Sequence, residues 1–347
     1  MKVLFGWQLG AGQGHIQRLA ALARTLDSVG VEPVFALKSY NIKGISFPWQ
    51  IVFAPPLRFS GREDSYTFAD ILETYGFGNA NQLRSHLQSW RSILAEVKPS
   101  LIIADHAPGL VLAARGIVPT VVVGDGFTVP PPVEVFPLLR FPAPPESEVR
   151  QEQVSNTVRS VVDLDAPLGK VLNGDANFIY SIPQLDHYRH LRTNDQYVSV
   201  HTAPIPSNLH NSDGSAWAYL ADDYPHRNLV LQTLRPQSDF KPLTEVLAGK
   251  SLAIHHGGLT TAITCLLAGI PQLILRRHLE QHLNGIRLSG LGVATMLNKP
   301  TWEGLLIAQA QAYTLTENAK VQAESLAHWN QNRIEIILQT CRKLLDM

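Results

Sequence analysis

Two histidines beside glycine-rich turns are the strongest chemical candidates in this chain of 347 residues. His15 comes directly after Gly10-Ala11-Gly12-Gln13-Gly14, which follows the apolar run 2–7. Histidine suits removal of a proton from a hydroxyl group, because its pKa lies near neutral pH. Asp105 ends a second apolar run, 100–104, and an aspartate can orient a histidine and stabilise its imidazolium form.

Ligands of open α/β sheets bind at the carboxyl ends of the strands, so we expect His15 and Asp105 to act there as a base and its orienting partner. Each residue also has a simpler interpretation. His15 could be a helix-capping or solvated histidine, and Asp105 could be the N-cap of the following helix.

The second histidine site is the segment His255-His256-Gly257-Gly258-Leu259-Thr260-Thr261. We expect a buried strand over 251–254, a tight turn, and a helix over 259–268. Two glycines let backbone N–H groups approach a ligand, and a helix N-terminus favours negative charge. The pattern predicts a diphosphate site at His256, Gly257 and Gly258, where these donors would stabilise a departing diphosphate. The alternative is a glycine turn that only caps the helix.

The first glycine turn does not fit a dinucleotide site. His15 stands where that motif has its last glycine, and the next apolar run ends at Leu37-Lys38 rather than at an acidic residue. No P-loop lysine motif occurs in the sequence.

Apolar runs alternate with amphipathic stretches along the chain, which favours a parallel sheet covered on both sides. The expected strands are 2–7, 32–37, 100–104, 119–123 and 177–181, and the expected helices are 15–29, 87–97, 110–115 and 146–162. The segment 127–145 is rich in proline and apolar residues, so it reads as a long functional loop. A second α/β unit is expected over 217–315, and a final helix over 317–345.

Composition narrows the classes of function. The chain has 29 basic and 29 acidic residues, so its charge gives no reason to expect nucleic acid or an anionic membrane as a partner. It has two cysteines, Cys265 and Cys341, which fits a reduced intracellular protein. No signal peptide and no apolar run of membrane-spanning length is visible, so we expect a cytoplasmic protein without a transmembrane segment.

The second histidine site also resembles a known signature. The segment 255–261, followed by Glu280-Gln281 and Asn284, is similar to the donor-binding motif of the UDP-glycosyltransferase superfamily. The similarity continues through Ala268–Leu273, Arg287-Leu288 and Leu291–Val293.

This resemblance implies an α/β protein of GT-B fold, in which two Rossmann-like domains face each other across a cleft. It implies an acceptor-side domain over 1–200, a linker over 201–215 and a nucleotide-sugar-binding domain over 216–316. A C-terminal helix over 317–347 would cross back to the first domain.

The resemblance also implies roles for individual residues. His15 would be the catalytic base and Asp105 the aspartate that orients it. Thr260 or Thr261 would donate hydrogen bonds from their hydroxyl groups to the diphosphate, and Glu280 and Gln281 would bind sugar hydroxyls. Phe240 would belong to the loop that holds the nucleobase. An exposed helix start is the alternative for the Glu280–Gln281 pair, and an ordinary loop for Phe240. The full set of donor-binding candidates is Gly12, Gly14, Phe240, His256, Gly257, Gly258, Thr260, Thr261, Glu280, Gln281 and Asn284.

Several positions depart from the family pattern. Thr260 replaces its third glycine, and Thr264 stands where many members have a glutamate that binds the nucleotide ribose. Arg276 replaces a usual proline, and Tyr219–Asp222 replaces a Gly-Ser turn. The span from Tyr219 to His256 is also short, as if one βα unit were missing.

These observations predict an inverting, metal-independent glycosyltransferase (a hexosyltransferase) with no cofactor, since the nucleotide sugar is its substrate. The donor would be a nucleotide-diphospho-sugar, UDP-linked by the resemblance. The acceptor would be a small or lipid-like molecule near 127–145. Two alternatives stay open: a nucleotide-sugar epimerase of the same fold, and a non-catalytic nucleotide-sugar-binding partner of an active transferase. The sequence leaves the oligomeric state open.

Overall fold

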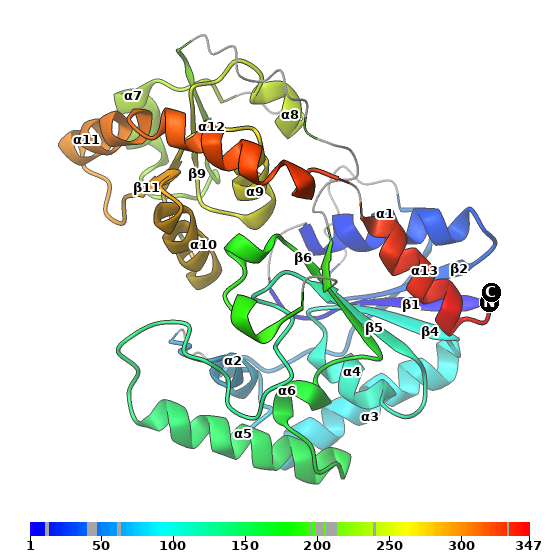
Figure 1. The fold of residues 1–347 in the computed structure, drawn as a ribbon. Coiled ribbons are helices and arrows are strands. Elements are labelled where there is room, and N and C mark those ends of the chain that lie inside the picture. Colours follow the sequence, from blue (N-terminus) through cyan, green and yellow to red (C-terminus); the bar gives the residue numbers. More distant parts are fainter. Residues whose placement is uncertain are drawn as a thin grey trace. The chain divides into compact units, whose positions relative to one another are not determined.

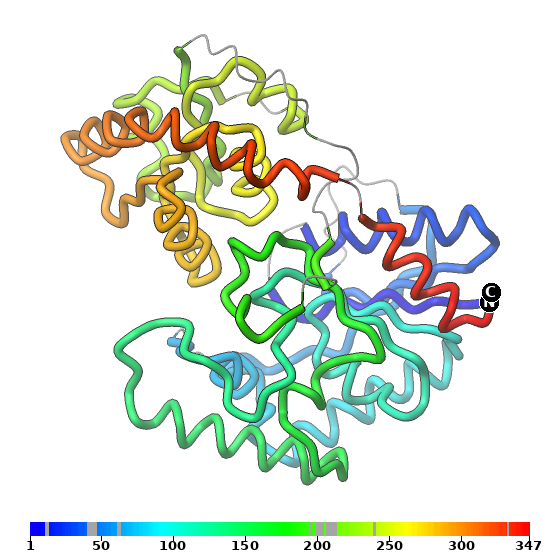
Figure 2. Tube along the Cα trace, viewed as in Figure 1, coloured from blue at the N-terminus to red at the C-terminus, as the bar shows by residue number. Residues whose placement is uncertain are grey.

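The structure is a computed structural model that describes residues 1–10, 14–39, 47–60, 64–193, 196–198, 205, 214–238, 241–331 and 333–347. The chain divides into two compact units. The first consists of Met1–Tyr180, His187–Tyr197 and Ile334–Met347, and the second of Ser181–Asp186 and Val198–Arg333. Figures 1 and 2 show the path of the chain through both.

The first unit is built on a seven-stranded sheet with the order β3-β2-β1-β4-β5-β6-β7. Neighbouring strands from β3 to β6 pair in parallel. The strands are β1 (Lys2–Trp7), β2 (Glu32–Leu37), β3 (Gln50–Phe53), β4 (Leu101–Asp105), β5 (Thr120–Gly124), β6 (Ala176–Tyr180) and β7 (Tyr197–Val198).

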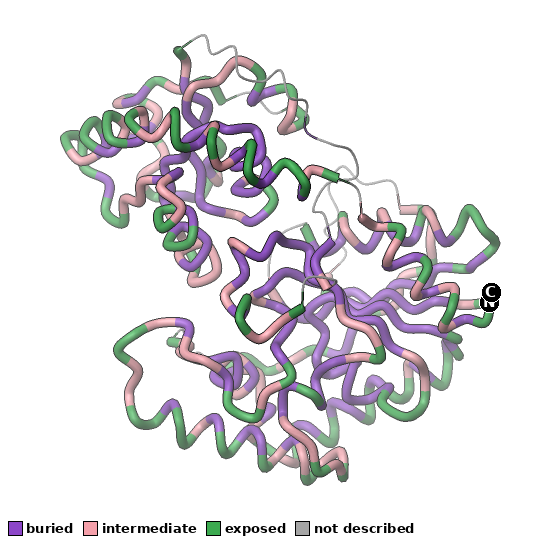
Figure 3. The backbone as a smooth tube through the Cα atoms, viewed as in Figure 1, coloured by how far each residue is buried: buried purple, intermediate pink, exposed green. Residues whose placement is uncertain are grey.

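Helices cover both faces of this sheet (Figure 1), with α1 (Gly14–Asp27) and α13 (Ile334–Leu344) on one face and α3 (Ala80–Val97) and α4 (Pro108–Ala114) on the other. The remaining helices of the unit are α2 (Phe68–Thr74), α5 (Glu146–Val162), α6 (Leu168–Val171) and the 3₁₀ turn η2 (Arg189–Leu191). β4 and β5 are buried throughout, as expected for strands packed on both faces (Figure 3).

The second unit has a smaller parallel sheet with the order β11-β10-β9-β8. Its strands are β8 (Ala216–Tyr219), β9 (Leu252–His255), β10 (Gln272–Ile274) and β11 (Ala294–Met296). Trp217 of β8 also forms an isolated parallel bridge with Gln237. Gln237 lies within the span that is short in the sequence.

The second unit's helices are α7 (Arg227–Leu234), α8 (Leu243–Val246), α9 (Leu259–Leu267), α10 (Leu279–Gly290), α11 (Trp302–Tyr313) and α12 (Thr316–Ser325), with the 3₁₀ turns η1 (Pro183–Leu185) and η5 (Ala327–Trp329). No helix in the described part of the chain is long and apolar enough to cross a membrane.

The expectation of one final helix over 317–345 is wrong. α12 ends at Ser325, η5 follows, and α13 begins at Ile334. Asn330 accounts for part of the break, because its side chain donates to the carbonyl of Ile205 at 2.9 Å and accepts from that residue's N–H at 2.7 Å. An asparagine that binds the backbone of another segment favours an irregular conformation over a helix. α12 belongs to the second unit and α13 to the first.

Other boundaries differ as well. α3 begins at Ala80 rather than at residue 87, because the side chain of Asn79 caps it by accepting from the N–H groups of Asn81 and Gln82. Neither β3 nor α2 was predicted from the sequence. Of the expected linker 201–215, the structure describes only 205, 214 and 215.

Candidate active site and nucleotide site

His15 lies at the start of α1, just beyond the carboxyl end of β1. It is buried, with 8% of its surface exposed. Its Nδ1 lies 2.8 Å from Oδ1 of Asp105. Asp105 is the last residue of β4, the strand next to β1 in the sheet, and its fractional exposure is 0%. The structure therefore brings the two sequence candidates into direct contact.

A carboxylate only accepts hydrogen bonds, so His15 donates from Nδ1 to Asp105 and keeps the lone pair on Nε2. That atom points toward the turn at residue 10, because a Cβ on Gly10 would lie 2.9 Å from His15 Nε2. This arrangement gives a proton acceptor whose tautomer is set by a buried carboxylate.

Arg18 holds the carboxylate from a second side. It lies one turn after His15 on α1, and its Nε and Nη2 donate to Oδ2 of Asp105 at 3.1 and 3.0 Å. Burial alone would raise the pKa of Asp105, but the charges and hydrogen bonds of Arg18 and His15 lower it to about 2. Asp105 is thus an anion at neutral pH.

A lysine contacts Gly10 close to this pair. Lys38 follows β2, donates from Nζ to the carbonyl of Gly10, and lies 5.0 Å from the centre of the Trp7 ring. The Trp7 ring stacks on His15 with centroids 5.4 Å apart. Burial lowers the pKa of Lys38.

The second unit carries the expected glycine turn between β9 and α9. Gly257 has a φ of +87°, and a Cβ there would lie 2.9 Å from the carbonyl oxygen of Gln281, so only glycine fits. Its N–H donates to Nδ1 of His255 at 3.0 Å. The Gly257 amide is therefore engaged inside the protein rather than presented to a ligand.

His255 completes this internal network. Since its Nδ1 accepts from Gly257, its Nε2 carries the proton and donates to Oε1 of Gln272 at 3.0 Å. Burial lowers the pKa of His255 to about 4, so the ring is neutral at neutral pH.

His256 differs from the expectation that it would donate to a phosphate. Its Nε2 accepts from the N–H of Ala221 at 3.0 Å, so its Nδ1 carries the proton and donates to the carbonyl of Leu275 at 2.6 Å. Both ring nitrogens are engaged with backbone, and burial lowers the pKa of the ring. In this structure His256 joins the segments after β8 and β10 and offers no free donor.

Gly258 is the part of the turn that is open. It is the N-cap of α9, and no side chain among the described residues caps the helix there. A Cβ on Gly258 would meet no atom within 4 Å. The first N–H groups of a helix have no partner within the helix, so those of Leu259 to Thr261 can serve a ligand. Thr260 is exposed and Thr261 half-buried, so their side chains are accessible at the same helix end.

Thr264, which stands at the family's ribose-binding position, is buried and does not reach the surface of the protein. Its fractional exposure is 0%, and its hydroxyl donates to the carbonyl of Thr260 at 2.7 Å.

The candidates on α10 include a residue that binds the backbone of the glycine turn. Asn284 is 1% exposed, and its Nδ2 donates to the carbonyl of Gly257 at 3.0 Å. Oε1 of Gln281 accepts from the N–H of Arg277 at 2.8 Å. Glu280 lies half-buried in the first turn of α10. The side chains of Asn284 and Gln281 therefore hold the backbone of Gly257 and Arg277 in place.

The three remaining site candidates are Gly12, Gly14 and Phe240. Gly14 is exposed and begins α1. Gly12 and Phe240 lie outside the described residues. Within the described residues, no group of three or more His, Cys, Asp or Glu side chains could hold a metal ion.

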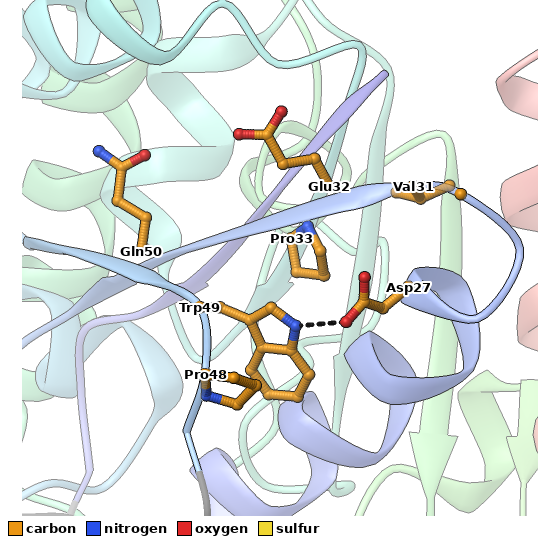
Figure 4. Close-up of a pocket in the computed structure, with 8 residues that line it drawn as sticks. Asp27, Val31, Glu32, Pro33, Pro48, Trp49 and Gln50 are labelled. Carbon is orange, nitrogen blue, oxygen red and sulfur yellow. Dashed lines mark hydrogen bonds between the residues drawn. The ribbon is translucent and has the colours of Figure 1, made fainter.

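Two of the cavities among the described residues each lie within one unit. One of about 360 Å³ is at the amino ends of β2 and β3, the edge of the sheet opposite His15, and there Trp49 donates to Asp27 at 2.8 Å (Figure 4). The other, of about 260 Å³, is at the carboxyl end of β8, and its lining includes the exposed Tyr219 and Ala221, whose N–H binds His256. The second cavity is therefore connected to the glycine turn through the hydrogen bond from Ala221 to His256.

The sequence did not single out Arg18, Lys38 or His106, although each lies at the His15 site. Arg18 could have been found from its spacing, since residues three apart share a helix face. His106 directly follows Asp105, and it is buried with its ring stacked on His15 at a centroid distance of 6.0 Å.

Known proteins resemble the chain in both sequence and fold. Residues 226–333 match the family of erythromycin biosynthesis protein CIII-like C-terminal domains. Glycosyltransferase GtfC of Amycolatopsis orientalis is 33% identical over 75 residues, which are 22% of this chain and only 18% of GtfC.

The fold likeness extends over the whole chain. The calicheamicin glycosyltransferase CalG4 has a TM-score of 0.65 at 14% identity, with 99% of this chain and 98% of CalG4 covered. The spinosyn rhamnosyltransferase SpnG, complexed with thymidine diphosphate, scores 0.61 at 17% identity, with 94% and 96% covered.

The chain therefore has the GT-B fold, as the sequence predicted.

Proposed function

We propose that the protein is an inverting glycosyltransferase that moves a sugar from a nucleoside-diphosphate sugar to an acceptor hydroxyl group. The observation that carries this proposal is the 2.8 Å contact between His15 Nδ1 and the buried Asp105, at the carboxyl edge of a sheet in a GT-B fold. Such a pair suits deprotonation of an alcohol.

In the proposed reaction His15 Nε2 takes the proton of the acceptor hydroxyl as its oxygen attacks the anomeric carbon. The bond from that carbon to the diphosphate oxygen breaks, and the diphosphate leaves with the electron pair. A single displacement of this kind inverts the anomeric configuration. Asp105 stabilises the imidazolium that His15 becomes.

The donor's diphosphate is proposed to bind at the N-terminus of α9. The open Gly258, the first N–H groups of α9 and the hydroxyls of Thr260 and Thr261 support this placement. These donors would stabilise the charge that grows on the leaving group, which is why the proposed mechanism uses no metal. Glu280 and Gln281 are proposed to bind the sugar.

The donor nucleotide is proposed to be thymidine or uridine diphosphate. The superfamily resemblance of the turn supports uridine, whereas the thymidine diphosphate in the structure of SpnG supports thymidine. We favour thymidine, because SpnG shares the fold over 94% of this chain.

The acceptor is proposed to be a small lipophilic alcohol or phenol. Phe141 and Val135 in the proline-rich segment are 80% and 66% exposed, and apolar side chains at such exposure suit an apolar ligand. SpnG has also been solved with spinosyn aglycone. The proposed location is the cytoplasm, since both cysteines are free and buried thiols.

A two-stage screen tests the proposal. A thermal-shift assay with dTDP, UDP, ADP and GDP identifies the nucleotide, because a ligand of the folded state raises the unfolding temperature. The corresponding glucose donor is then offered with phenols, anthraquinones and macrolactone alcohols, and nucleotide release and glycoside are measured. Glycoside formation with inverted configuration is expected. Conversion of the donor without acceptor would indicate an epimerase, and binding without turnover a non-catalytic partner.

A further inference from the structure

We propose that His106 is an acceptor-binding residue, whose neutral imidazole donates a hydrogen bond to the attacking oxygen while His15 removes its proton. This inference rests on the proposed function and adds a second histidine to that site. Every group it uses belongs to the first unit.

Both the backbone conformation of His106 and the burial of its ring are energetically unfavourable. It has a φ of +47°, in the left-handed region that side chains other than glycine rarely adopt. It is 6% exposed, and neither ring nitrogen has a hydrogen-bond partner among the described residues. Backbone strain and unsatisfied buried polar groups both destabilise a fold, and they concentrate at functional sites.

The geometry indicates what the ring could bind. A Cβ on Gly10 would lie 2.9 Å from His15 Nε2 and 3.1 Å from His106 Nδ1, so these two nitrogens face the same small space beside the glycine. The centroids of the two rings are 6.0 Å apart. Nε2 is the nitrogen of His15 that Asp105 leaves free.

A hydroxyl group is the ligand that fits two such nitrogens. Its hydrogen would point to His15 Nε2, which has a lone pair, and its oxygen would accept from N–H at His106 Nδ1. The acceptor oxygen has two lone pairs. One accepts the hydrogen bond from His106, and the other stays free to attack the anomeric carbon.

The surroundings keep His106 neutral, as this role requires. Burial lowers the pKa of His106 to about 3, and the positive charges of Lys38 and Arg18 act in the same direction, although Asp105 opposes the shift. The carbonyl of His106 accepts from the N–H of Leu9 at 2.9 Å, which fixes its backbone beside the turn at Gly10.

Three variants test the inference: His106→Leu, His106→Asn and His106→Gly. Leucine removes the donor at similar volume. Asparagine keeps a short amide donor and tolerates a positive φ, and glycine relieves the φ and serves as a folding control. Each variant is assayed with the acceptor that the wild-type protein glycosylates fastest in the panel above, and nucleotide affinity and thermal unfolding are measured alongside.

We expect His106→Leu and His106→Gly to lower kcat/KM for the acceptor about 10- to 100-fold, at unchanged nucleotide affinity. His106→Asn should recover at least half of that loss on a logarithmic scale. His106→Gly should unfold no earlier than the wild-type protein, because its strain and its unsatisfied ring are gone.

Wild-type acceptor kinetics in His106→Gly, or equal losses in the glycine and asparagine variants, would overturn the inference. Failure of the proposed function is distinguishable, since the wild-type protein itself would then form no glycoside.

Discussion

At the scale of single residues, the site depends on one buried carboxylate with two donors. Asp105 accepts from His15 and from Arg18, whose side chain is 16% exposed. In Asp105→Asn the guanidinium of Arg18 would lose its anion while staying largely buried. We expect the free energy of unfolding to fall by about 3–5 kcal/mol, since an unpaired buried charge is strongly destabilising. Urea denaturation measures this change.

The double variant Asp105→Asn/Arg18→Gln is the matched control. Removing the charge of Arg18 should restore most of the lost stability, while transfer stays at least 100-fold below the wild-type rate because His15 lacks its orienting anion. A single Asp105→Asn variant as stable as the wild type would contradict this role for the pair.

At the scale of elements, the turn between β9 and α9 contains two adjacent glycines that differ in their tolerance of a side chain. Gly257 needs its φ of +87° and lies against Gln281, so Gly257→Ala should destabilise the fold by about 1–3 kcal/mol. Gly258 has a φ of −60° and open space, so Gly258→Ala should change stability by less than about 0.5 kcal/mol. Urea denaturation of both variants measures these differences.

Nucleotide affinity gives a second test, which concerns Gly258. The methyl group of Gly258→Ala would project into the space where the diphosphate is proposed to bind, so dTDP and UDP affinity should fall although the fold is intact. Calorimetric titration measures it, with Thr314→Ala, at the end of α11, as a surface control. Unchanged nucleotide affinity in Gly258→Ala would place the diphosphate elsewhere.

The sequence predicted the elements better than their contacts. Apolar runs located β1, β2, β4, β5 and β9, because strands buried on both faces are apolar throughout. The partners of His256 could not be predicted, since Ala221 and Leu275 reach it from segments far apart in the chain. The positive φ of His106 was equally hidden, because it is a property of the folded backbone.

At the scale of the whole molecule, buried neutral histidines in both units make stability depend on pH. Burial lowers the pKa to about 4 for His86, about 3 for His106 and about 4 for His255. In the unfolded chain these groups titrate at about pH 6.5. Between these values the unfolded state binds more protons, so stability is full above about pH 6.5 and falls as the pH is lowered toward 4.

We expect each of these histidines to contribute up to about 1.4 kcal/mol per pH unit in that range. Urea denaturation at pH 7, 6 and 5 measures the slope. His86→Gln removes one titrating group and should reduce the slope by one proton equivalent. A free energy of unfolding that stays constant from pH 7 to 5 would contradict the buried neutral state.

The most direct test of the proposed chemistry is transfer by His15→Ala, with donor binding measured separately. We expect calorimetry to give the wild-type dissociation constant for the nucleoside-diphosphate sugar, because the proposed diphosphate site uses residues of the second unit. Single-turnover transfer to the acceptor should fall by at least about 100-fold, the usual contribution of a general base. Transfer at the wild-type rate in His15→Ala would contradict His15 as the base.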